Sequence, residues 1–193
     1  LPFVRYVQLV NGNPVALWRD PQVRGFVRTI VVLVLLLVFL LESDVHMGNE
    51  QAFREALFNV TSIISGTGYA SVDYMQWGSF AVALFFFIGL IGGCAGSTAC
   101  SIKIFRYQLL FASVRAQLRR IRSPHGIFTP RYDGRPVSEE VLASVMSFFV
   151  FFIVTLGLVA VALSMTGLDF VTAVSGAATA VGNIGPGLGD IIG

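Results

Sequence analysis

The chain has 193 residues, of which 55% are hydrophobic and 12% charged, and its mean hydropathy is +0.77. A soluble domain cannot expose so much apolar surface to water, so the composition excludes a soluble protein and predicts an integral membrane protein. The net charge is +2, with two cysteines and no visible Ser, His and carboxylate constellation. We therefore expect no enzyme, no catalytic residue and no covalent cofactor.

The amino-terminal segment is basic. Residues 1–28 contain four arginines against a single acid, Asp20, which predicts a cytoplasmic approach segment over residues 1–24. The uncharged residues 29–41, extended by residues 25–28, predict a first transmembrane helix. Residues 42–55 reverse the sign of the charge and are expected outside the membrane.

A short helix and a glycine-containing turn follow. Asn49 can cap a helix that runs to residue 65, and the sequence then continues Gly66-Thr67-Gly68-Tyr69. Residues 61–71 are too polar to span a bilayer, so we expect them to enter it and return, with carbonyl oxygens that replace the water shell of a cation. The carboxyl end of the helix would favour a cation by its dipole.

Residues 77–95 predict a second span, but its second half is rich in small residues. One interpretation is close packing, since Gly89 with Gly93 and Gly92 with Gly96 match a small-xxx-small pattern. The other is a discontinuous helix that lines the ion path below the filter. The residues alone leave both interpretations open.

The strongest topology signal follows this span. Eight of the thirteen basic residues lie between Lys103 and Arg135, which predicts that this side is cytoplasmic. The charges indicate either contact with anionic lipid or a docking surface for a cytoplasmic subunit. Residues 123–138 are expected to form a loop, and we predict no nucleic-acid partner.

The pattern of the first half then returns. Ser138 is a capping residue, residues 141–165 predict a span, and Asp169 can cap a short helix through residue 181. Glycines and a proline follow in residues 182–189, so this stretch is expected to re-enter the membrane. Gly68 aligns on Gly185, and the two halves predict a helix–pore loop–helix repeat.

In this repeat, which is that of potassium-channel-like pores, the two pore loops would bind a dehydrated cation by backbone carbonyls only. Gly68 and Gly185 would hold backbone angles that side chains disfavour, and the carbonyls just before them would be the ligands. The predicted filter residues are Gly66, Thr67, Gly68, Asn183, Ile184 and Gly185.

Residues 58–106, with Ser-Gly-Thr-Gly-Tyr and Gly-Gly-Cys-Ala-Gly-Ser-Thr-Ala, resemble the third repeat of the Trk/Ktr/HKT potassium transporter superfamily, specifically its bacterial Trk type. Residues 179–189 resemble the fourth pore loop of that family. The resemblance implies an all-α membrane pore of four repeats for potassium uptake across the cell (inner) membrane. It also implies a dimer of the full-length parent and a cytoplasmic nucleotide-binding regulatory subunit.

The resemblance further implies a gating loop below the filter, with Lys103 and Arg106 on its cytoplasmic side. Cys100 and Ser101 stand where the family usually has glycines. The expected gating-loop residues are Gly92, Gly93, Cys94, Ala95, Gly96, Ser97, Thr98, Ala99, Cys100 and Ser101.

By this resemblance residues 25–122 form the third repeat with a basic extension, and residues 139–193 form part of the fourth. The basic segments 1–28 and 103–135 would be cytoplasmic, and the pore loops would enter from outside. We expect a fragment that begins after two repeats, stops before the last helix and conducts nothing alone. The alternatives are a sodium-coupled Ktr-like or sodium-selective relative, and a scaffold whose glycines only pack helices.

Overall fold

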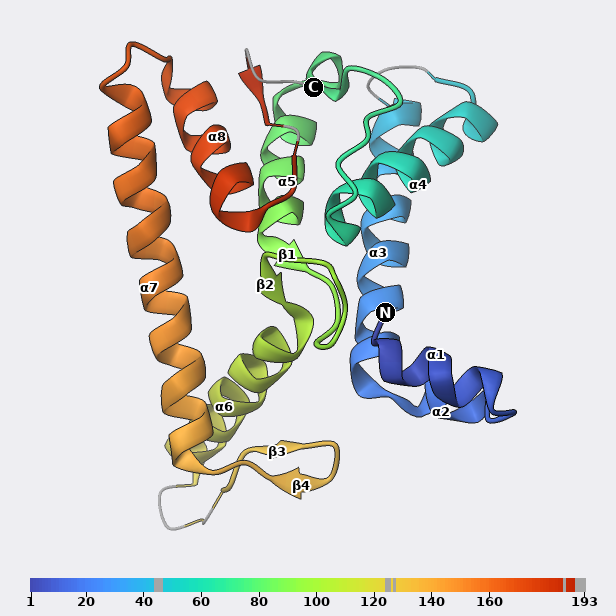
Figure 1. The fold of residues 1–193 in the computed structure, drawn as a ribbon, viewed down its shortest axis with the longest axis vertical. Helices are drawn as coiled ribbons and strands as arrows, with labels where there is room; N and C mark the ends of the chain where they lie inside the picture. The colour runs from blue at the N-terminus through green and yellow to red at the C-terminus, as the bar shows by residue number, and fades with distance from the viewer. Residues whose placement is uncertain (44–46, 124–125, 127, 186, 190–193) are drawn as a thin grey trace.

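The computed structural model describes residues 1–43, 47–123, 126, 128–185 and 187–189. Apart from two pairs of two-residue strands, every element in these ranges is helical, so the fold class is all-α (Figure 1). The elements in chain order are α1 (Phe3–Val10), α2 (Val15–Arg19), α3 (Pro21–Ser43), α4 (Asn49–Ser65), the 3-10 helix η1 (Tyr74–Trp77), α5 (Ser79–Leu90), β1 (Ile91–Gly92), β2 (Ile102–Lys103), α6 (Ile104–Arg122), β3 (Arg131–Tyr132), β4 (Arg135–Pro136), α7 (Glu139–Ser164) and α8 (Phe170–Gly182).

Within the described ranges, α3 and α7 are long and apolar enough to cross a bilayer, with 23 and 26 residues. α3 begins at Pro21, earlier than the predicted residue 25, because proline suits the first helical turn and Asp20 Oδ1 accepts a hydrogen bond from the Gln22 amide at 2.8 Å. The predicted cap of α7 is confirmed, since Ser138 Oγ accepts from the Val141 amide at 3.4 Å.

α4 and α8 are short helices that start near one end of the molecule and descend only to its middle, where the chain turns back (Figure 1). They contain 17 and 13 residues, or about 26 and 20 Å of helix. The predicted Asn49 cap is wrong, because Gly48 occupies the N-cap position and no side chain caps α4. The predicted Asp169 cap is confirmed by bonds from the Val171 and Thr172 amides.

The predicted second span, residues 77–95, is wrong in extent. α5 contains 12 residues and ends at Leu90, which is about 18 Å of helix and roughly half of a bilayer core. The chain then pairs as a parallel strand, with Ile91 opposite Ile102 and Gly92 opposite Lys103. Residues 93–101 therefore form a loop closed at its base, and the discontinuous-helix interpretation is the one that the structure supports.

The predicted loop at residues 123–138 contains a short antiparallel hairpin, in which Arg131 pairs with Pro136 and Tyr132 with Arg135. Asp133 and Gly134 both have positive φ, of 50° and 77°, as a two-residue type I′ turn requires. Residues 124, 125 and 127 of this predicted loop, and residues 186 and 190–193 of the predicted fourth repeat, lie outside the described residues.

Two helix pairs organise the packing. α3 lies along α4, α7 lies along α8, and α5 contacts both α4 and α8 (Figure 1). α4 packs against the buried apolar side of α3, which includes Val34, Leu37 and Leu41. Each long outer helix thus supports a short inner helix, and the ends of the two short helices approach each other in the middle of the molecule.

Candidate functional site

Both short helices end in the same backbone motif. At the end of α4, the Thr67 amide donates to Ser62 O at 2.9 Å and the Gly66 amide to Ile63 O at 3.0 Å. At the end of α8, residues 184 and 183 make the equivalent bonds to the carbonyls of residues 179 and 180, at 3.1 and 3.4 Å. These are the two bonds of a Schellman motif, which turns the chain sharply after a helix.

The motif requires a left-handed residue directly after each helix. Gly66 has φ +74° and Asn183 has φ +49°. Glycine takes this conformation at no cost, and asparagine is among the few other residues that tolerate it. Two residues further on, Gly68 and Gly185 also have positive φ, of 78° and 111°, so the predicted backbone role of both glycines is consistent with the structure.

The carbonyl oxygens of the two turns receive no hydrogen bond from the part of the chain that the structure describes. Among the described residues, none donates a hydrogen bond to the carbonyl oxygens of the six predicted filter residues, which are Gly66, Thr67, Gly68, Asn183, Ile184 and Gly185. Carbonyl groups inside a protein are normally paired. A row of unpaired carbonyls on two facing turns can instead coordinate a cation.

The two turns lie close together although Gly185 comes 117 positions after Gly68. A Cβ atom placed on Gly185 would lie 3.6 Å from Gly68 Cα, and one placed on Gly66 would lie 3.8 Å from Asn183 O. A single added carbon would therefore be enough to bring the two backbones into van der Waals contact. This places all six predicted filter residues in one cluster.

Polar side chains from α4 hold the first turn from behind. Asn59 is fully buried, accepts from the Ser71 amide at 3.1 Å and donates to Ser71 Oγ at 2.8 Å. Ser71 Oγ donates in turn to the carboxylate of Glu55. This network, Glu55–Asn59–Ser71, fixes the returning chain to the helix that precedes it.

Ser175 of α8 braces the second turn at the same place, and the Tyr74 hydroxyl of η1 donates to Gly187 O at 3.4 Å. Ser175 Oγ accepts from the Leu188 amide and donates to Leu188 O, both at 3.0 Å. Ser71 and Leu188 both lie three residues after the aligned glycines. Sequence reasoning missed Glu55, Asn59 and Ser175, although polar residues inside an otherwise apolar helix stripe were the signal that could have indicated them.

The predicted gating loop lies directly against the ends of the two short helices. The Ser101 amide donates to Gly182 O at 3.0 Å, and Ser101 Oγ lies 2.8 Å from Gly89 O and 3.1 Å from Gly182 O. Asn183 Nδ2 donates to Cys100 Sγ at 3.5 Å. The loop thus connects the broken end of α5 with the end of α8.

Small residues are required where the loop closes. A Cβ on Gly92 would lie 1.9 Å from Cys100 O, and one on Gly93 would lie 2.7 Å from the Ala99 Cβ. Ser101 has φ +55°, a conformation that favours glycine. In this chain the Ser101 hydroxyl bonds to Gly89 O and Gly182 O, while the Ser101 backbone keeps this unfavourable angle.

Other contacts hold the far side of the loop. The Phe3 amide donates to Gly96 O at 3.0 Å, and the Ala95 amide donates to Gln22 Oε1 at 2.8 Å. Lys103 Nζ donates to Ser97 O at 3.3 Å. Arg106, which is predicted to lie on the cytoplasmic side of the loop, lies over the Phe148 ring, 3.8 Å from its centroid, and links α6 to α7.

Residues 11–192 match the protein family described as TrkH, cation transport protein. The chain is 43% identical to the Trk system potassium uptake protein TrkI of Halomonas elongata, over 100% of this chain and 39% of that protein. It is 35% identical to the Trk system potassium uptake protein TrkH of Vibrio parahaemolyticus, over 93% of this chain and 37% of the relative.

A solved structure has the same fold. The crystal structure of the potassium transporter TrkH from Vibrio parahaemolyticus superposes with a TM-score of 0.90 and 31% sequence identity, covering 99% of this chain and 42% of that one. The chain spans about two fifths of the length of the relatives it matches.

Proposed function

This chain belongs to the TrkH family of cation transport proteins, and from that premise we propose that it supplies two walls of a potassium uptake pore. The relatives are named potassium uptake proteins. The observation that carries the proposal is the contact of two re-entrant turns whose carbonyl oxygens have no donor among the described residues. The rest of the filter would come from parts of the longer parent.

The proposed mechanism begins with dehydration of the ion. Carbonyls of Gly66, Thr67, Asn183 and Ile184 replace water molecules around a potassium ion, and Gly68 and Gly185 keep the backbone turned so that these oxygens can face it. The carboxyl ends of α4 and α8 lie at the base of the two turns. Their partial negative charges favour a cation in the space below.

Residues 92–101 are proposed as the gate of this pore. Ser101 and Cys100 contact the end of α8, immediately beside the second turn. A loop at that position obstructs the path below the filter while its hydrogen bonds to Gly182 and Asn183 hold, and opens it when they break.

We place the basic residues of α6 and of the β3–β4 hairpin on the cytoplasmic side of the cell membrane, and the pore loops toward the outside. The working unit would be a dimer of the full-length parent with a nucleotide-binding regulatory subunit on the cytoplasmic face. The basic surface that follows α5 supports that arrangement, because it lies on the side from which such a subunit would reach the loop.

The function is tested in the full-length parent, expressed in a strain deficient in potassium uptake. Gly68→Ala and Gly185→Ala each force a side chain into a positive-φ conformation that costs about 1–2 kcal/mol, so we expect potassium uptake to fall by about tenfold. The potassium-to-sodium uptake ratio should fall with it, because the carbonyls are turned away.

Gly134→Ala is the matched control, since Gly134 has φ +77° in the hairpin and no atom within 4 Å of its Cβ position. It should leave the uptake ratio unchanged. An unchanged ratio in both pore-loop variants would identify the glycines as packing residues only, as in a scaffold. Growth at limiting potassium with sodium varied separates potassium uptake from a sodium-dependent or sodium-selective activity.

A further inference from the structure

A cavity of about 370 Å³ lies between α6 and the β3–β4 hairpin, remote from the pore loops. Arg115 and Arg119 line it from α6, and Arg131 lines it from the first position of β3. Residues four apart on a helix share one face, so both α6 arginines reach the same space. Phe128 and Thr129 also line it.

The three arginines have no acidic partner among the described residues. The ion pair found in these ranges joins Arg5 to Asp20, far along the chain from the cavity. Glu139 lines a neighbouring cavity together with Arg120 and does not line this one. Positive charges four residues apart repel each other, so the cluster gains most from a bound anion.

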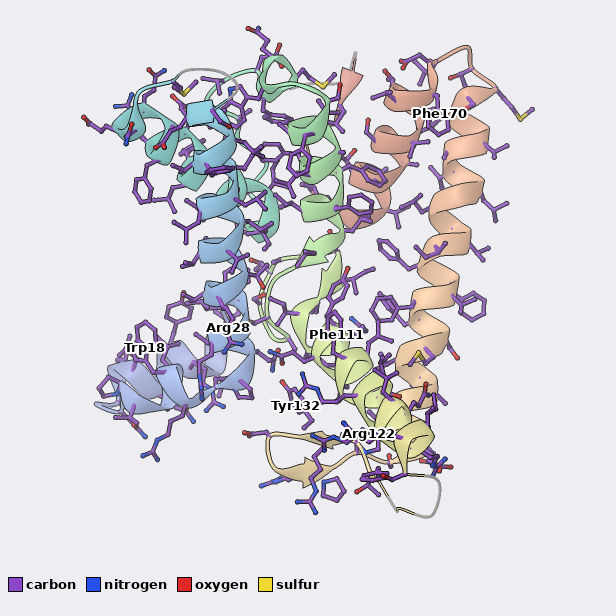
Figure 2. The ribbon with its side chains drawn as sticks, turned by 180° about the vertical axis from the view of Figure 1, so that it is seen from behind. Trp18, Arg28, Phe111, Arg122, Tyr132 and Phe170 are labelled. Atoms are coloured by element: carbon purple, nitrogen blue, oxygen red, sulfur yellow. The ribbon has the colours of Figure 1, made fainter. Side chains whose placement is uncertain are left out.

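The cavity lies toward one end of the molecule, beyond the most apolar parts of its helices. Figure 2 shows Arg122 and Tyr132 at the lower end of the molecule, below Arg28 and Phe111. This is the end of α6 and of the hairpin that lines the cavity, and it corresponds to the headgroup region or the adjacent cytoplasm in the orientation proposed above.

We propose that Arg115, Arg119 and Arg131 form a binding site for a phosphate group on the cytoplasmic side of the membrane. Guanidinium groups donate two parallel hydrogen bonds to phosphate oxygens, and three arginines line this one cavity. The phosphate comes either from an anionic lipid headgroup or from a soluble phosphate compound. The ligand is recognised by its charge and its oxygens in both cases.

Strand β3, which packs on α6, carries Arg131 on one side and Tyr132 on the other. Tyr132 follows Arg131 and points to the other side of the strand, because strand side chains alternate. Its hydroxyl is buried, and no described residue bonds to it. Burial, followed by the nearby Asp20 carboxylate, raises the pKa of Tyr132 to about 12. Asp20, directly before α3, therefore lies near enough to Tyr132 to influence its pKa.

The test uses the purified full-length parent and two probes. Native mass spectrometry counts phosphatidylglycerol retained from an equal mixture with phosphatidylcholine, and calorimetry measures binding of inorganic pyrophosphate. We expect Arg115→Gln/Arg119→Gln/Arg131→Gln to weaken binding of the probe that occupies the site by about tenfold or more, because three charge-assisted contacts are lost. Loss for the lipid alone identifies a headgroup, and loss for pyrophosphate alone identifies a soluble phosphate.

Arg19→Gln/Arg24→Gln/Arg28→Gln is the matched control, since it removes the same charge elsewhere on the same side. Equal losses in the two triple variants would mean a general charge effect and overturn the site. Unchanged binding of both probes in the cavity variant would also overturn it, and would leave the arginines to an acidic protein partner. This binding test is independent of ion flux, so its outcome does not depend on the proposed function.

Discussion

The two pore turns share a backbone and differ in what supports it. Both end a short helix with a Schellman motif and carry a positive-φ glycine two residues later. The first turn is braced by the Glu55–Asn59–Ser71 network, whereas the second is braced by Ser175 of α8 and by the Tyr74 hydroxyl of η1. The second turn also contacts the predicted gating loop, residues 92–101, through the hydrogen bond from Asn183 to Cys100.

This difference indicates a division of labour on the described part of the chain. Three polar residues hold the first turn and leave its carbonyls little freedom, which suits a fixed wall of the filter. The second turn is held by Ser175 and Tyr74 and also touches the loop that we propose as the gate. Backbone geometry is therefore repeated in the two turns, and we propose that the side chains make the first turn rigid and couple the second turn to the loop.

The largest effect is expected from Asn59→Ala. Asn59 is fully buried and makes three hydrogen bonds, so its removal leaves buried polar groups unpaired at a cost of roughly 2–3 kcal/mol. Thermal unfolding of the full-length parent should occur at lower temperature, and the potassium-to-sodium uptake ratio should fall.

Val60→Ala is the control for Asn59→Ala, because Val60 is equally buried on the same helix but makes no polar contact with the first turn. It should lower stability and leave the uptake ratio unchanged. If Asn59→Ala also preserved the ratio, the network would stabilise the fold without positioning the filter.

Ser175→Ala is expected to have a smaller effect, since it removes two hydrogen bonds to Leu188 and leaves that backbone unit unpaired, a loss of about 1–2 kcal/mol. Uptake should become less selective, but less so than in Asn59→Ala. Ser113→Ala, a buried serine on α6, serves as the control. A larger selectivity loss in Ser175→Ala than in Asn59→Ala would reverse the proposed division of labour.

Exchange of the two left-handed residues tests the comparison directly. Gly66→Asn and Asn183→Gly each keep a residue that tolerates positive φ, so stability should change by less than about 1 kcal/mol. Asn183→Gly removes the contact with Cys100 and should change the open fraction in single-channel records. Gly66→Asn should not, and equal effects of the two variants would contradict a special coupling of the second turn.

The smallest expected effect concerns the starts of the two short helices. The hydrogen bond with Thr172, above all, holds the pKa of Asp169 below its usual range. A carboxylate with a lowered folded-state pKa stabilises the helix above its unfolded pKa, about 3.9, and loses this contribution as pH falls through the folded value. The Gly48 cap of α4 has no titrating side chain.

Hydrogen exchange, corrected for intrinsic rates, should therefore show that acid selectively loosens the first turn of α8 and not that of α4. Asp169→Asn keeps a capping oxygen without the charge and should remove this pH dependence. If acid increased hydrogen exchange equally at the starts of both helices, the cause would be destabilisation of the whole fold and not the loss of the Asp169 cap.

Much of the architecture follows from short stretches of sequence. The long apolar runs, the capping serine and aspartate, and the glycines of the two turns act within a few residues of their own positions. Their effects can therefore be predicted from the sequence without knowledge of the fold. The cluster of the six predicted filter residues also followed, because Gly68 and Gly185 align in two matching segments of the chain.

The tertiary structure decided where the second span stops and what braces the turns. Residues 77–95 are apolar enough for one helix, yet α5 ends at Leu90 because the next residues pair with Ile102 and Lys103 and Ser101 bonds to Gly182. Asn59 and Ser175 likewise brace the turns only because folding brings Ser71 and Leu188 within hydrogen-bond distance of them. Local apolar runs and glycines are recognised from neighbouring residues, whereas a broken helix and a buried polar brace depend on partners brought close only by folding.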